Sequence, residues 1–306
     1  MLSRVANTIY WMGRYLERAE NTARIINVNS HLLLDLPKKV RLGWQPIIDI
    51  ISFREDFYQF YDTADELSVV KFMVCDKNNP SSIMSSLSAA RENARTIREI
   101  IPREVWEQIN KLYLTTLNEQ NDFLNHRNRY ECLNKIINGN QMITGMLAGT
   151  MTHDEGYDFL RMGRNIERAD MTTRILDVRS ASLLPELEQE LSTFDNIQWM
   201  SVLKSLSAYQ MYRRKVRLRI SRPDVLKFLL QEDHFPRALC HSLQQLKHCL
   251  QNLPRFEQIY QQVDRLEMQL MQANPQNLKQ EKLHEFIDDM QLGLINIHDQ
   301  ISTNYF

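Results

Sequence analysis

The stretch MGRYLERAENTARI, residues 12–25, returns as MGRNIERADMTTRI at residues 162–175. The offset is 150 residues, and nine of the fourteen positions are identical. Both copies carry apolar side chains three and four residues apart, which is the spacing of the core-facing side of an amphipathic helix. The sequence therefore predicts two long helices with nearly the same charged face.

Two further matches follow in the same order along the chain. Trp44 corresponds to Trp199 at an offset of 155, and residues 80–87 correspond to 236–243 at an offset of 156. Slowly growing offsets are what small loop insertions leave after a gene duplication, and two copies are too few for a solenoid. The pattern predicts a tandem duplication.

The fold class follows from composition and periodicity. The 306 residues include only 8 Gly and 9 Pro, so few turns are available and a sheet-rich fold is disfavoured. We expect an all-α protein of two tandemly duplicated helical bundles, residues 1–150 and 151–306, related by pseudo-twofold symmetry and packed as one module. Apolar periodicity gives about twelve helices. They are expected near residues 3–34, 44–60, 62–75, 81–100, 103–122, 127–150, 152–184, 196–218, 223–231, 236–252, 255–273 and 279–302.

Charge and cysteine content exclude several classes of protein. The 37 Lys and Arg nearly balance the 38 Asp and Glu, so the net charge of −1 gives no field that would draw in nucleic acid. Neither a membrane span nor a signal peptide is expected, because no apolar stretch is long enough. The four cysteines form no Cys-x-x-Cys pair, which is typical of reduced thiols. We expect a cytoplasmic protein that binds neither nucleic acid nor membranes.

The charged positions of the repeated motif form the candidate site. Glu17, Glu20 and Arg24 share one helix face beside the apolar stripe, and Arg14 and Arg18 lie about 100° around the helix. Arginine forks bind carboxylate or phosphate groups, and paired carboxylates can hold Mg²⁺. The candidate ligand- or partner-binding residues are Arg14, Glu17, Arg18, Glu20, Arg24, Arg164, Glu167, Arg168, Asp170, Arg174, Arg213 and Arg214.

Three interpretations of the motif face are open from the sequence. The first is a closed, ion-paired seam between helices, in which buried charges must be paired. The second is an open site for a polar ligand or partner where the two copies converge, and the third is a catalytic metal site. Gly13 and Gly163 indicate that another helix or a ligand comes close, because glycine in a helix costs about 1 kcal/mol relative to alanine.

No cofactor or metal is predicted, with Mg²⁺ at the paired carboxylates as the alternative. Glu-x-x-His repeats, typical of di-iron bundles, are missing from the motif, and His234, His241 and His248 lack further ligands that would complete a metal site. Four positive charges within residues 213–217 could bind phosphate or an acidic partner, although a solvated helix face is the favoured interpretation. Nucleotide-binding and hydrolase motifs are absent.

Several stretches together resemble a known family. They are MLSRVAN at 1–7 with YWMGRYLERAE at 10–20, NPSSI at 79–83 with ARENAR at 90–95, FLRMGRNIERAD at 159–170, SAY and YRR within 207–214, and FPR at 235–237. In this order they resemble the alpha-E domain family of bacterial proteins over nearly the full length of the chain. Asp170 is the shorter acid where the first copy has Glu20, so the two halves are unequal.

The resemblance implies an all-helical fold and an association with circularly permuted ATP-grasp amide ligases, with transglutaminase-like proteins as further neighbours. Our leading hypothesis is a non-catalytic binding partner of such a ligase in peptide or amide-product biosynthesis, holding substrate or ligase through its Glu/Arg helix faces. The alternative is an enzyme of that biosynthesis. In that case Glu17, Glu20, Glu167 and Asp170 would serve as acid/base groups or Mg²⁺ ligands.

Overall fold

The protein is all-α. The computed structural model describes residues 1–35, 43–181, 192–216 and 219–306, and every regular element within them is a helix. The first half contains α1 (Ser3–Asp35), α2 (Gln45–Ile50), α3 (Arg54–Tyr58), α4 (Glu66–Val74), α5 (Ile83–Thr96), α6 (Arg103–Asn118), α7 (Gln120–Leu124) and α8 (His126–Thr150). The second half contains α9 (Glu155–Ala181), α10 (Ser192–Ser205), α11 (Tyr209–Val216), α12 (Arg222–Gln231), α13 (Leu239–Leu250), α14 (Glu257–Gln272), the 3₁₀ turn η1 (Pro275–Asn277) and α15 (Gln280–Tyr305).

The described residues contain more helices than periodicity predicted, because three of the expected segments are broken. The segment near 103–122 is divided at Glu119, which lies between α6 and α7. Ser52, with φ 57°, separates α2 from α3, and Ser207, with φ 53°, separates α10 from α11. A residue in the left-handed region ends a helix, and apolar spacing alone does not reveal it. The predicted helix end near residue 184 and residues 217–218 lie outside the described residues.

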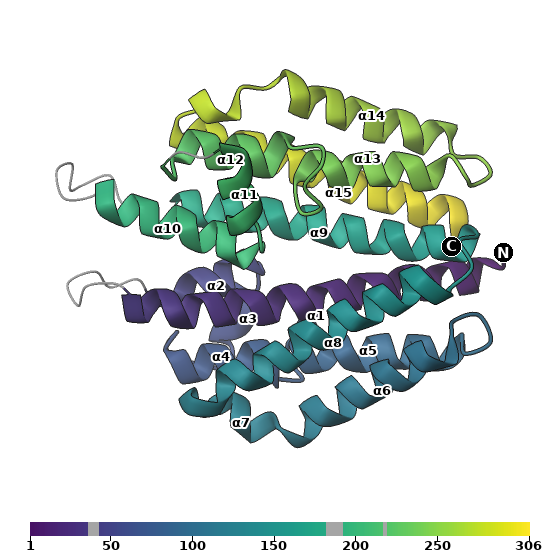
Figure 1. The fold of residues 1–306 in the computed structure, drawn as a ribbon, viewed down its shortest axis with the longest axis horizontal. Helices are drawn as coiled ribbons and strands as arrows, with labels where there is room; N and C mark the ends of the chain where they lie inside the picture. The colour runs from purple at the N-terminus through teal and green to yellow at the C-terminus, as the bar shows by residue number, and fades with distance from the viewer. Residues whose placement is uncertain (36–42, 182–191, 217–218) are drawn as a thin grey trace.

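Helices α1 and α9 lie side by side through the middle of the molecule (Figure 1). They run parallel, since the backbone at Gly163 meets Tyr10 and the side chain of Glu167 meets Arg18. A Cβ atom at Gly13 would lie 2.5 Å from the carbonyl oxygen of Leu160, and one at Gly163 would lie 2.1 Å from the carbonyl oxygen of Tyr10. Both glycines are therefore required by the close approach of the two backbones, as their positions within helices indicated.

The outer helices repeat the same arrangement around each central helix. Helix α5 packs on α1 and α13 packs on α9, while α8 and α15 cover α1 and α9 respectively. Two shorter helices each contact the central helix of the other half, α2 contacting α9 and α10 contacting α1. In Figure 1 the first half occupies mainly the lower layer and the second half the upper layer. The order of helices is what a duplication would produce, and the duplication itself stays a prediction.

The core is continuous across these layers. Fully buried apolar side chains of α1 and α9, such as Ile9, Met12 and Met162, belong to the same cluster as Trp199 of α10. Across the described ranges, no helix is long and apolar enough to span a bilayer.

Candidate functional site

The two Glu-Arg dipeptides of the motif face each other across α1 and α9. Nε and Nη2 of Arg18 donate to the two carboxylate oxygens of Glu167 at 2.5 and 2.9 Å. In the reverse direction, Nε and Nη2 of Arg168 donate to the two oxygens of Glu17 at 3.0 and 2.7 Å. Paired forks of this kind fix geometry as well as charge. The motif therefore forms a reciprocal ion-paired seam.

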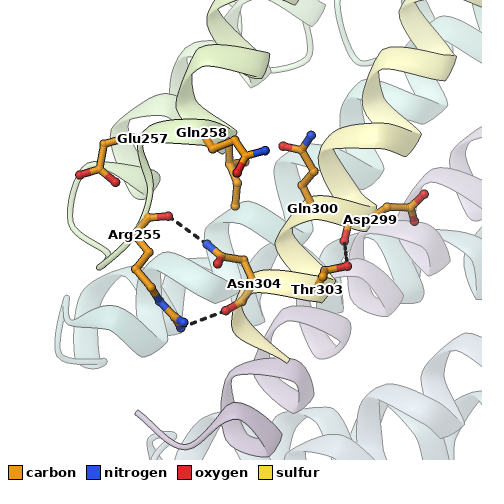
Figure 2. A pocket seen from close by; sticks show the side chains of 8 residues that line it. Arg255, Glu257, Gln258, Asp299, Gln300, Thr303 and Asn304 are labelled. Atoms are coloured by element: carbon orange, nitrogen blue, oxygen red, sulfur yellow. Dashed lines mark hydrogen bonds between the residues drawn. The ribbon is translucent and has the colours of Figure 1, made fainter.

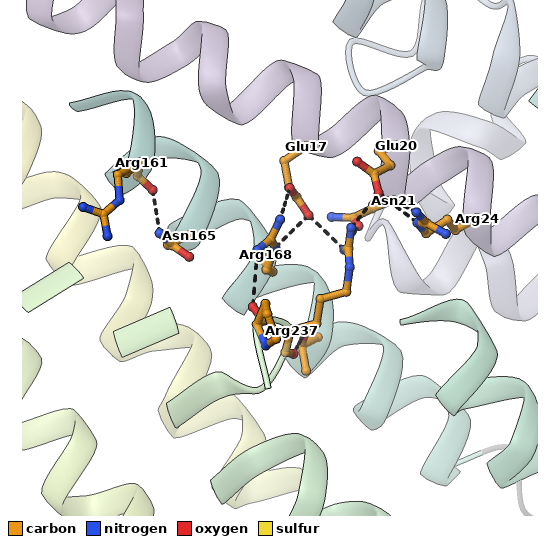
Figure 3. Close-up of polar contacts among 10 residues, drawn as sticks. Glu17, Glu20, Asn21, Arg24, Arg161, Asn165, Arg168 and Arg237 are labelled. Carbon is orange, nitrogen blue, oxygen red and sulfur yellow. Dashed lines mark hydrogen bonds and ion pairs between the residues drawn. The ribbon is translucent and has the colours of Figure 1, made fainter. Parts of the chain in front are cut away.

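A third element closes the group around Glu17 (Figure 3). Arg237, just before α13, donates from Nη1 to Glu17 and Asn21 at 2.9 and 2.6 Å, and from Nη2 to Glu20 at 2.7 Å. Arg24 donates to the same oxygen of Glu20 at 2.9 and 2.7 Å. The side chains of Glu17, Glu20 and Arg237 are at most 9% exposed. We call this set the Arg237 cluster: Glu17, Glu20, Asn21, Arg24, Arg168 and Arg237.

The corresponding group around Glu167 is more open. Nε of Arg14 donates to Glu167 at 2.8 Å, next to the Arg18 fork. Nε of Arg174 donates to Asp170 at 2.9 Å, in the same i,i+4 order as Arg24 and Glu20 in the other group. The side chains of Asp170 and Arg174 are 19% and 23% exposed, whereas those of Glu20 and Arg24 are 6% and 13% exposed.

A cavity of about 330 Å³ opens beside this second group. Residues 80–81 precede α5 as residues 236–237 precede α13, so Ser81 stands where the other half has Arg237. A serine side chain is too short to reach the carboxylates as Arg237 does. We call the cavity the Ser81 pocket, and its lining is Arg14, Arg18, Thr22, Ile51, Phe53, Pro80, Ser81, Glu167, Asp170, Met171 and Arg174.

The two central carboxylates are strongly acidic. Burial raises the pKa of Glu17, but Arg168 and Arg237 outweigh burial and lower it to about 2. Burial likewise raises the pKa of Glu167, while Arg18 and Arg14 lower it to about 2. A carboxylate with so low a pKa is a weak general base near neutral pH, and Mg²⁺ could reach it only by displacing guanidinium partners. The geometry at these two residues favours structural pairing.

The structure brings most of the predicted site residues together, but in two groups rather than around one shared centre. Arg164 differs from the other motif arginines, because its buried Nε has no hydrogen-bond partner among the described residues, although it lines a cavity of about 20 Å³ together with Glu17 and Glu20. Arg213 and Arg214 lie elsewhere, exposed on α11, as the interpretation of a solvated face predicted. Arg217 of that patch lies outside the described residues.

Sequence reasoning missed Arg237, Ser81 and Thr22. The signal was present in the repeat, because the match of residues 80–87 with 236–243 sets Ser81 against Arg237. Without a structure, nothing in that match tells which residues of the flanking loops reach the motif.

A larger cavity, of about 530 Å³, lies between the start of α14 and the end of α15 (Figure 2). There Arg255 and Asn304 donate to each other's backbone carbonyl oxygens at 3.0 and 2.9 Å. Figure 2 shows Glu257 turned away from this pair. Its charged lining residues, Arg255, Glu257 and Asp299, form no ion pair with one another among the described residues, so it is a weaker candidate than the Ser81 pocket.

Among the residues that the structure describes, two groups near the surface combine a histidine with two carboxylate side chains. Exposed groups of this kind are common without an ion, and no second feature points to a metal at either. They are Glu232 with Asp233 and His234, and Asp177 with His284 and Asp288.

The comparison with protein families agrees with the all-helical fold and with the repeated Glu-Arg dipeptide. Residues 1–306 match the Alpha-E family, described as a predicted alpha-helical domain with a conserved ER motif. The dipeptides Glu17-Arg18 and Glu167-Arg168 fit that description.

Curated relatives are known, but none of those found has an assigned function. Uncharacterised proteins of Mycobacterium bovis and Mycobacterium tuberculosis are 23% identical over 302 residues, covering 90% of this chain and 33% of each relative. The chain thus spans about a third of the length of these relatives. No solved structure matches. On the strength of the full-length match, this chain belongs to the Alpha-E family.

Proposed function

We propose that this chain is a non-catalytic binding partner of an ATP-grasp amide ligase in peptide or amide-product biosynthesis, where it holds substrate or ligase. One observation carries the proposal. The central carboxylates of both motif copies are held by guanidinium groups, while an arginine-lined pocket beside one copy stays open. The pocket offers a place where a ligand can bind, whereas Glu17 and Glu167 are paired and so are not free to act as acid/base groups.

The ligase as partner comes from the family resemblance, in which such ligases and transglutaminase-like proteins are associated with alpha-E domains. The length of the relatives supports a domain that works beside another, because the match covers only 33% of each of them. Since an ATP-dependent ligase works where ATP is abundant, the proposal includes a cytoplasmic location. It also includes a gene duplication as the origin of the two halves, which the matching order of helices supports.

The exposed arginines of α11 are the proposed contact with the ligase. Arg213 and Arg214 lie on one short helix that packs on α10 and α12, away from the seam contacts of α1 with α9. Exposed arginines are suited to carboxylate groups on a partner's surface.

The test uses the tagged full chain and a circularly permuted ATP-grasp ligase from the same organism. We expect the two to elute together and the ligase to form its amide product faster when the chain is present. Replacing Arg213 and Arg214 by Ala should release the ligase, whereas Arg103→Ala, whose side chain is 86% exposed on α6, serves as the matched control. Full ligase activity without the chain, together with separate elution, would reject the proposal.

A further inference from the structure

The Ser81 pocket lacks a group that the other half supplies for itself. In the Arg237 cluster, the hydroxyl of Thr172 donates to the carbonyl oxygen of Arg237 at 3.0 Å. The corresponding Thr22 is fully buried and lines the pocket, yet its hydroxyl has no hydrogen-bond partner in the part of the chain that the structure describes. A buried, unpaired hydroxyl is unfavourable and marks a place where a polar ligand would be satisfied.

The missing group is not a second guanidinium. Glu17 accepts three hydrogen bonds, from Arg168 and Arg237. Glu167 also accepts three hydrogen bonds, from Arg18 and Arg14. Arg18 corresponds to Arg168, and Arg14 donates the hydrogen bond that Arg237 donates in the other group. A cation entering the pocket would find Glu167 occupied and would face three arginines.

The unclaimed groups of the pocket are mainly donors. Arg18 donates from Nε and Nη2 to Glu167, and Arg174 donates from Nε to Asp170 and from Nη1 to Ser52. Within the described ranges, Nη1 of Arg18 and Nη2 of Arg174 make no hydrogen bond. Arg14 lies over the ring of Trp11 at 4.8 Å, which fixes the plane of its guanidinium. These N–H groups and the hydroxyl of Thr22 together present a donor surface to an anion.

Charge selects the kind of anion. Three arginines and two carboxylates line the pocket, which gives a formal charge of +1. One carboxylate neutralises that charge, whereas a phosphate dianion would leave a negative charge uncompensated in a partly buried site.

The rest of the wall suits an uncharged organic body. Ile51, Phe53, Pro80 and Met171 supply an apolar side, and the volume of about 330 Å³ is at the small end of the range for ligand pockets. A ligand with one carboxylate and a small apolar or amide-linked body would use both sides.

We propose that the Ser81 pocket binds the carboxylate end of a small amide-containing molecule, such as the C-terminal residue of a peptide. The carboxylate lies against Arg14, Arg18 and Arg174, and the hydroxyl of Thr22 completes its hydrogen bonds. The role of this ligand as something held for a ligase rests on the proposed function, but binding itself is a property of the isolated chain.

The experiment titrates the isolated chain at neutral pH by calorimetry with N-acetylphenylalanine, with its C-terminal amide, and with inorganic phosphate. We expect saturable binding of the acid, with the amide and phosphate at least tenfold weaker. Thr22→Val and Arg174→Gln should each weaken binding of the acid tenfold or more. The matched variants on the filled side, Thr172→Val beside the Arg237 cluster and Arg24→Gln within it, should bind like the wild type.

Each alternative result has a definite meaning. No saturable binding of the acid, equal binding of acid and amide, or loss of binding in both sets of variants would overturn the proposal. Tighter binding of phosphate than of the acid would overturn the choice of a carboxylate. If the acid binds as expected but the ligase neither elutes with the chain nor responds to it, the proposed function fails and the pocket assignment stands.

Discussion

The Arg237 cluster and the Ser81 pocket are built on the same pair of helices and the same dipeptide, yet one is filled and the other is open. In the cluster, Arg237 reaches Glu17 and Glu20 from the loop before α13. In the pocket, the loop before α5 has the short side chain of Ser81 at the position that corresponds to Arg237. The comparison teaches that the motif fixes the helix seam, while the loop packed against it decides whether a binding space remains.

The two groups also differ in the pKa of the arginine that lies one helical turn before the Glu-Arg dipeptide, Arg14 in α1 and Arg164 in α9. Burial lowers the pKa of Arg14, but Glu167 outweighs it, and the pKa of Arg14 is raised overall. For Arg164, burial and Arg168 lower the pKa, and Glu17 only partly offsets them. Arg237 thus pairs with Glu17, the carboxylate that Arg164 would otherwise hold. The guanidinium of Arg164 is therefore the one beside the Arg237 cluster that has no carboxylate partner among the described residues.

The largest effect that we expect is acid destabilisation, because it acts on both groups at once. The pKa of each central carboxyl lies at about 2 in the folded chain, below the ordinary 4.5, so folding is favoured above pH 4.5 and this contribution is lost as the pH falls toward 2. Each shift is worth on the order of 3 kcal/mol. Burial, helped by Arg14, lowers the pKa of His298 from 6.5 to about 4, which adds a further loss between those values.

Urea unfolding at a series of pH values measures this loss. The free energy of unfolding should fall steeply below pH 4.5, and the Glu167→Gln variant should lose about half of the carboxylate contribution. A free energy that stays flat from pH 5 to 3 would show that the carboxyls are not held by guanidinium groups in the folded chain.

Next in size is the loss of one central carboxylate. Glu17→Gln leaves Arg168 and Arg237 buried with reduced compensation and should cost about 3–5 kcal/mol in the free energy of unfolding. Glu167→Gln should cost about 1 kcal/mol less, because Arg18 is 18% exposed whereas Arg237 is 9% exposed, so water can solvate the freed guanidinium. Denaturant unfolding of both variants measures the difference, and a larger cost at Glu167 would reverse the assignment of filled and open sides.

A glycine substitution tests the close contact between α1 and α9. Gly163→Ala places a methyl group against the backbone of Tyr10, where no flexible side chain can yield, and should cost about 3 kcal/mol or more. Gly145→Ala is the matched control, since a Cβ there meets nothing within 4 Å and helix propensity should stabilise the chain by up to about 1 kcal/mol. Thermal unfolding compares the two, and equal melting temperatures would mean that α1 and α9 do not approach as described.

The smallest effect on stability should come from filling the pocket at its loop residue. Ser81→Leu places an uncharged side chain in a space that is already partly open and should change the free energy of unfolding by less than about 1 kcal/mol. It should nonetheless abolish binding of N-acetylphenylalanine by occupying the pocket. Calorimetric titration of this variant measures that loss, and unchanged binding would move the ligand away from residue 81.

The fold was predictable where local pattern decides it. The repeated stretch at 12–25 and 162–175 gave two long helices and an all-α chain, because apolar spacing and charge are properties of each helix alone. Gly13 and Gly163 predicted that another helix or a ligand comes close to each of these two helices. The breaks at Ser52 and Ser207 were not predicted, because the spacing of apolar residues carries no information on a single residue with a left-handed backbone.

The candidate site was predictable only in part. The charged residues of the motif are paired between the two copies, as in the interpretation of an ion-paired seam, and the two reciprocal pairs lie in two groups, of which one borders an open cavity. The role of Arg237 depends on how a loop more than 200 residues away folds against Glu17, and a pattern within one helix carries no information on that contact.

Double-mutant cycles across the seam test the account most directly. Arg18 with Glu167, and Arg168 with Glu17, would each be changed singly and together to uncharged residues, and the free energies of unfolding compared. The account predicts a coupling energy of about 1.5 kcal/mol or more for both pairs. Single effects that add within about 0.5 kcal/mol at both pairs would contradict the reciprocal seam on which the cluster and the pocket depend.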